Sequence, residues 1–85
     1  MNKFTYTIKD KDGIHARPAG ILVKEASKFK SEITIESKGI VGNAKKIFSL
    51  MSLGVKYDDE ITVTAAGEDE KEAIESIENY IKNNL

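Results

Sequence analysis

The 85-residue sequence contains no cysteine and no tryptophan, and it has a single proline and a single histidine. Without cysteine, neither a disulfide scaffold nor thiol chemistry is available. A formal net charge of −1 argues against a general nucleic-acid-binding protein. No hydrophobic run approaches the length of a membrane span, and the N-terminal residues lack the apolar core of a signal peptide. We therefore expect one cytoplasmic domain, residues 1–85, with no membrane insertion.

Alternation of apolar and polar side chains predicts three β-strands, and a turn signal predicts a short additional strand between the second and the last of them. Phe4, Tyr6 and Ile8, for example, alternate with polar residues, which is typical of a strand with one buried face. Lys38 and Gly39 favour a turn between the second and third strands, so we expect these two to form a hairpin. The predicted strands are residues 3–9, 32–36, 40–41 and 60–65.

Apolar residues at steps of three and four predict three helices. The first covers about residues 16–29 and the second about residues 45–53, followed by Gly54 at a position suited to a left-handed helix end. The third starts near Asp69, where the Asp69-x-x-Glu72 spacing resembles a capping box. Its predicted core stripe is Ala73, Ile74, Ile77, Tyr80 and Ile81.

The predicted order is β-α-β-β-α-β-α, an α+β arrangement. Each strand has one apolar face and one face of Thr, Lys and Glu. Such strands form a sheet that helices cover on one side and water contacts on the other.

His15 lies immediately before the first predicted helix. Pro18 is tolerated in the first turn of a helix and places its start within a residue or two of position 16. The unpaired N–H groups and the dipole at a helix N-terminus form an anion site, to which Arg17 adds a permanent charge suited to phosphate oxygens. Imidazole is a good nucleophile at neutral pH, so this arrangement favours a histidine that carries a phosphoryl group.

Other interpretations of His15 are weaker. A lone histidine near a helix start is often a cap or a surface residue. We expect no metal site, because the chain has no cysteine and no second histidine to complete one. The order of residues offers no catalytic triad, and no nucleotide-binding glycine-rich loop occurs, so we expect no cofactor.

Two segments resemble the HPr family, the histidine-containing phosphocarriers of the bacterial phosphotransferase system. Gly13-Ile14-His15-Ala16-Arg17-Pro18-Ala19 is similar to the active-site signature of the family, and residues 45–54 are similar to its second helix and regulatory region. The resemblance implies an open-faced β-sandwich, with three helices on one face of a four-stranded antiparallel sheet. It also implies a phosphocarrier that accepts a phosphoryl group from phospho-Enzyme I and passes it to Enzyme IIA domains of sugar-specific permeases during sugar uptake.

The resemblance also assigns the residues of the site. His15 would carry the phosphoryl group on Nδ1, and Arg17 and the backbone N–H groups near Ala16 and Arg17 would hold its oxygens. In the second helix, Leu50 and Leu53 form one apolar stripe and Ile47, Phe48 and Met51 another. The resemblance implies that the second stripe docks on Enzyme I. The remaining expected contributors to partner binding are Gly20, Lys24 and the positive charges of Arg17, Lys45 and Lys46.

Lys46 departs from the family pattern. Many Gram-positive members have at this position a serine that a dedicated kinase phosphorylates, whereas lysine has no hydroxyl and carries the opposite charge. We expect no regulatory phosphoserine here, since Ser49 and Ser52 lie elsewhere on the helix. A monomeric carrier is the leading hypothesis. The alternative is a regulatory module with the same fold that acts only by docking on an enzyme or transcription factor; retention of His15 and Arg17 favours the carrier.

Overall fold

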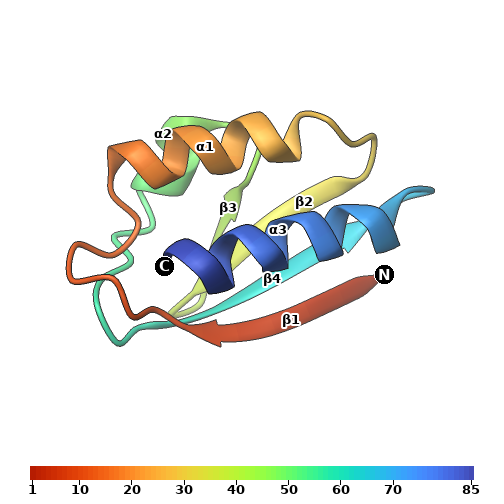
Figure 1. Cartoon of the computed structure of the whole chain (residues 1–85). Coiled ribbons are helices and arrows are strands. Elements are labelled where there is room, and N and C mark those ends of the chain that lie inside the picture. The colour runs from red at the N-terminus through yellow and green to blue at the C-terminus, as the bar shows by residue number, and fades with distance from the viewer.

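A computed structural model describes residues 1–85 and confirms the predicted order of elements (Figure 1). The strands are β1 (Asn2–Thr7), β2 (Glu32–Ser37), β3 (Ile40–Asn43) and β4 (Glu60–Ala66), and the helices are α1 (Ala16–Ala26), α2 (Ile47–Met51) and α3 (Glu70–Asn84).

The four strands form one antiparallel sheet in the order β1-β4-β2-β3. The two central strands are β4 and β2, with Ile35 opposite Val63, and Val63 also lies opposite Phe4 of β1. All three helices lie on the same face of this sheet (Figure 1). The expected open-faced sandwich is thus confirmed.

The hydrophobic core lies between that face and the helices. Alternate residues of the central strands, such as Ile33, Ile35 and Ile61, are buried, while Thr and Glu occupy the other face. Leu22 of α1 and Ile77 of α3 are fully buried against them. The period-two and helical patterns therefore selected the correct inward faces.

Two helices are shorter than the sequence predicts. After Ala26, the N–H groups of Lys28 and Phe29 bond to carbonyls three residues earlier, so the chain continues past α1 as tight turns. Helix α2 ends at Met51. Gly54 follows with a φ of +62°, as its position predicted, and its N–H donates to the carbonyl of Met51.

The predicted capping box at Asp69 is wrong, although α3 does begin next to this residue. The carboxylate of Asp69 makes no cap hydrogen bond. It accepts hydrogen bonds instead from the backbone N–H groups of Lys30 and Ser31 and from the Ser31 hydroxyl. These bonds, chiefly the one from the Ser31 hydroxyl, lower the pKa of Asp69 from 3.8 to about 2. The side chain thus ties the start of α3 to the segment before β2.

No helix in the fold has the length and apolarity needed to cross a bilayer.

Candidate functional site

The loop between β1 and α1 is fixed at several points before it reaches His15. The N–H of Asp10 donates to the carbonyl of Leu85 (2.8 Å), and the N–H of Ile14 donates to the carbonyl of Val55 (3.2 Å). Gly13 adopts a φ of +64°, and a Cβ there would lie 2.1 Å from the Val55 oxygen, so only glycine fits. The end of α3 and the segment before β4 therefore hold this loop in place.

His15 is the N-cap residue of α1, as the position of Pro18 predicted. Its carbonyl accepts the first helical bond, from Ala19 N–H, but its side chain makes no cap hydrogen bond and is 41% exposed. The N–H groups of Ala16 and Arg17 have no hydrogen-bond partner. Free N–H groups at a helix start attract anions, so the imidazole lies next to a preformed anion site.

A hollow of about 320 Å³ opens beside this helix start. Arg17 lines it, is exposed and forms no ion pair with a protein carboxylate. Tyr80 and Asn84 of α3 form another part of its wall. Burial raises the pKa of the Tyr80 hydroxyl, while the charge of Arg17 opposes that shift. The residues lining the hollow are Asp10, His15, Arg17, Pro18, Ile21, Tyr80 and Asn84.

The sequence did not indicate that α3 contributes to this site. Tyr80 belongs to the apolar stripe of the helix and was predicted to lie in the core. It is partly buried and packs against the core, and its side chain also lines the hollow. Asn84 carries no sequence signal for a site. Both line the hollow beside His15 because the end of α3 packs beside the β1–α1 loop.

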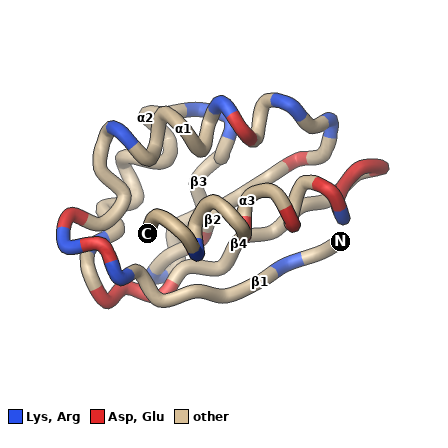
Figure 2. The backbone as a smooth tube through the Cα atoms, in the orientation of Figure 1, with Lys and Arg blue, Asp and Glu red and all other residues tan.

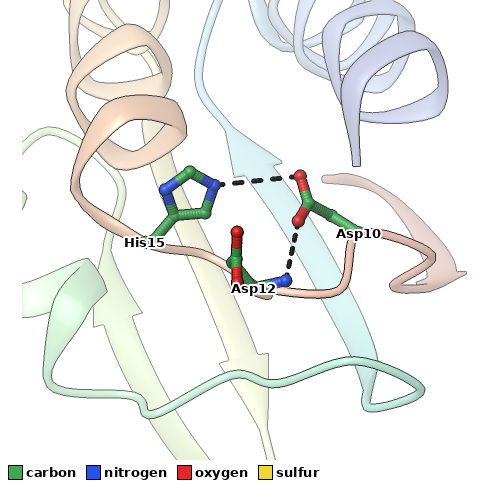
Figure 3. A group of neighbouring side chains, drawn as sticks. All are labelled: Asp10, Asp12 and His15. Atoms are coloured by element: carbon green, nitrogen blue, oxygen red, sulfur yellow. Dashed lines mark hydrogen bonds and ion pairs between the residues drawn. The ribbon is translucent and has the colours of Figure 1, made fainter.

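Two carboxylates lie beside His15 (Figure 3). Oδ2 of Asp10 is 3.8 Å from Nε2 of His15, and Oδ1 of Asp10 accepts a hydrogen bond of 2.8 Å from the Asp12 N–H. The sequence identified residues 10–13 only as a turn. The argument against a metal site considered cysteine and histidine and missed these carboxylates: Asp10, Asp12 and His15 offer ligand atoms within 4.8 Å of one another. These three residues are the donors that could reach a metal ion.

The short helix α2 presents the two stripes that the sequence predicts. Leu50 and Leu53 are buried, whereas Phe48 is 82% exposed and Met51 is 40% exposed. Ile47 is partly buried, and a Cβ on Gly20 of α1 would lie 3.8 Å from its side chain. Helices α1 and α2 thus form one surface on which Phe48 and Met51 stand out.

Positive charge lies along this surface. Figure 2 shows Lys and Arg along α1 with the acidic Glu25 among them, while other acidic residues lie in the loops and along α3. Lys24 and Lys46 are exposed and form no ion pair. Lys45 was expected to contribute positive charge as well; its Nζ is partly buried and donates to the carbonyl of Phe29 (2.7 Å), forming no ion pair. Lys45 therefore ties the segment before α2 to the turns that follow α1.

The serines of α2 are already engaged within the fold. The Ser49 hydroxyl accepts a hydrogen bond from the Asn43 N–H, and the Ser52 hydroxyl donates to the Ser49 carbonyl, each at 2.8 Å. Lys46 is the N-cap residue of α2. The positive end of a helix would stabilise a phosphate group at that position. It does not stabilise the positively charged side chain of lysine.

The comparisons with known proteins agree with this geometry. The model of a family described as "PTS HPr component phosphorylation site" matches residues 2–83. The chain belongs to the HPr family. Phosphocarrier protein HPr of Mycoplasma genitalium is 52% identical over 99% of this chain and 97% of its own length, and that of Mycoplasma pneumoniae is 49% identical over 96% and 94%.

Solved HPr structures share the fold over nearly the whole chain. A histidine-containing phosphocarrier protein from Mycoplasma superposes with a TM-score of 0.94 at 45% identity, covering 96% of this chain and 93% of that one. HPr from Thermoanaerobacter tengcongensis gives 0.92 at 43% identity, covering 98% and 93%. The protein is a phosphocarrier of the phosphotransferase system and serves sugar transport, as the resemblance implied. A module that acts only by docking is not favoured.

Proposed function

We propose that His15 is the residue that carries the phosphoryl group, on Nδ1. The observation that supports this is the exposed imidazole beside the unbonded N–H groups of Ala16 and Arg17. Those groups and the unpaired guanidinium of Arg17 bind the phosphoryl oxygens. Phosphoryl transfer depends mainly on positioning and on charge stabilisation, and these residues supply both without a cofactor.

The donor is phospho-Enzyme I and the acceptors are Enzyme IIA domains, which the carrier meets in the cytoplasm as a monomer. Both partners dock on the surface formed by Ile47, Phe48 and Met51, with Gly20 beside it and Lys24 at its edge. An exposed aromatic ring and a flexible methionine suit a surface that must fit more than one partner. Unpaired lysine and arginine side chains speed the encounter with acidic partner faces.

The carrier is not controlled by phosphorylation at position 46. Lys46 offers no hydroxyl, and the hydroxyls of Ser49 and Ser52 are hydrogen-bonded within α2 and to β3. Phosphoryl transfer at His15 therefore proceeds without inhibition from a phosphoserine on this helix.

The test is a reconstituted transfer reaction. The protein is incubated with phosphoenolpyruvate and purified Enzyme I, and acid-labile phosphate is measured by intact mass before and after acid treatment. The wild-type chain gains one acid-labile phosphate, and His15→Ala gains none while it keeps its circular dichroism spectrum. Labelling of His15→Ala, or none of the wild-type chain, would contradict the proposal.

A further inference from the structure

The side chain of Asp10 lines the hollow and faces His15, but as a carboxylate it is not a ligand for phosphoryl oxygens. Its Oδ2 lies 3.8 Å from Nε2 of His15, while Nδ1 is on the other side of the ring (Figure 3). We propose that Asp10 is a positioning residue that keeps the proton of the neutral imidazole on Nε2 and so leaves the lone pair of Nδ1 free to attack phosphorus. This inference rests on the proposed role of His15.

The chemistry of the two groups gives the direction of the effect. A neutral imidazole has one N–H donor and one acceptor nitrogen, and an ionised carboxylate only accepts hydrogen bonds. A carboxylate opposite Nε2 therefore favours the tautomer with Nε2–H, because the other tautomer would place two lone pairs against each other. The partner of one ring nitrogen commonly sets which nitrogen is protonated.

Asp10 is held rigidly enough to do this. Its N–H donates to the Leu85 carbonyl, its carbonyl accepts from the Gly13 N–H (3.1 Å), and its Oδ1 accepts from the Asp12 N–H. Only Oδ2 remains to face the imidazole. The ring itself extends from the N-cap of α1, so both partners are positioned by backbone contacts rather than by each other.

The tautomer matters because no proton has to move during the transfer. The lone pair of Nδ1 forms the bond to phosphorus, the bond between phosphorus and the leaving atom of the donor breaks, and its electron pair departs with the donor. Nε2 keeps its proton, and the positive charge that develops on the ring faces the Asp10 carboxylate. The reverse steps deliver the group to the acceptor, with Nδ1 taking back the electron pair.

The tautomer of His15 can be measured by NMR without any partner protein. Because the chain has one histidine, a two-bond ¹H–¹⁵N correlation spectrum of the neutral form shows a single imidazole. We expect a protonated Nε2 and an unprotonated Nδ1 in the wild-type chain. Asp10→Ala should move both nitrogen shifts toward a tautomer mixture and slow transfer from phospho-Enzyme I by about two- to fivefold, since the pair is partly exposed. Asp10→Asn retains an acceptor oxygen and should restore part of both effects.

Asp12→Asn is the matched control. It removes an equal charge near the ring from a residue that forms no ion pair with His15, and it keeps the N–H that holds Asp10. Unchanged nitrogen shifts in Asp12→Asn support a specific pair. The inference is overturned if Asp10→Ala leaves the shifts or the transfer rate unaltered, or if Asp12→Asn changes them equally. Failure of wild-type labelling would instead refute the role of His15, since the spectrum needs no Enzyme I.

Discussion

Replacing Leu50 or Phe48 by alanine should separate stability from docking, although both belong to the five-residue helix α2. Leu50 is 0% exposed and belongs to the core, so Leu50→Ala removes packed methyl groups and leaves a cavity. Such changes cost about 2–5 kcal/mol of unfolding free energy. For a domain of this size, a loss of about 3 kcal/mol lowers the Tm by about 12–24 °C.

Phe48 is 82% exposed, and truncating an exposed side chain changes the unfolding free energy by about 0.5 kcal/mol or less. The same truncation removes the largest side chain of the proposed docking surface. If Phe48 is a binding hot spot, its loss costs about 2 kcal/mol of binding free energy, which raises the Kd for Enzyme I about thirtyfold.

The assay combines urea unfolding with calorimetric titration against Enzyme I for both variants. Leu50→Ala should bind almost normally at a temperature where it is folded, whereas Phe48→Ala should be stable and bind weakly. Equal destabilisation by the two changes would show that α2 is oriented wrongly. A stable Phe48→Ala with unchanged affinity would show that its surface does not contact Enzyme I.

Four further outcomes are expected. His15→Ala should lose acid-labile phosphate, measured by intact mass, with an unchanged unfolding midpoint. Arg17→Glu should slow transfer from Enzyme I in rapid-quench kinetics by about ten- to a hundredfold, because a charge-assisted hydrogen bond contributes about 1.5–3 kcal/mol; wild-type kinetics would make Arg17 a bystander. The unmodified chain should gain no phosphate from a purified HPr kinase and ATP, whereas Lys46→Ser should become a substrate; phosphorylation of the unmodified chain would refute this. The folded-state pKa of Asp69 is lowered from 3.8 to about 2, so unfolding free energy should be retained above pH 4 and fall as the pH approaches 2; urea titrations should show a smaller fall in Asp69→Asn, and an equal fall would exclude Asp69 as a cause.

The sequence identified most of the local structure because local structure depends on neighbours in the chain. The period-two and helical patterns, together with the turn at Lys38 and Gly39, predicted every strand and helix, and Pro18 located the start of α1 beside His15. The predicted ends of the helices were less accurate. Helix α1 stops at Ala26, because the residues that follow form tight turns instead of continuing the helix. The sequence patterns did not specify the strand order β1-β4-β2-β3, because strands joined by helices can pair in several ways.

The sequence by itself therefore determined the candidate nucleophile and its anion-binding helix start, and the family resemblance identified the exposed stripe of α2. Only the tertiary structure decided which distant groups surround them. Asp69 bonds to Ser31 rather than capping its own helix, and the Nζ of Lys45 donates to the carbonyl of Phe29, a residue distant from it in the sequence. Tyr80 reaches the hollow beside His15 because the end of α3 packs there. A side chain's partner depends on the shape of the folded chain, which periodicity and spacing along the sequence do not specify.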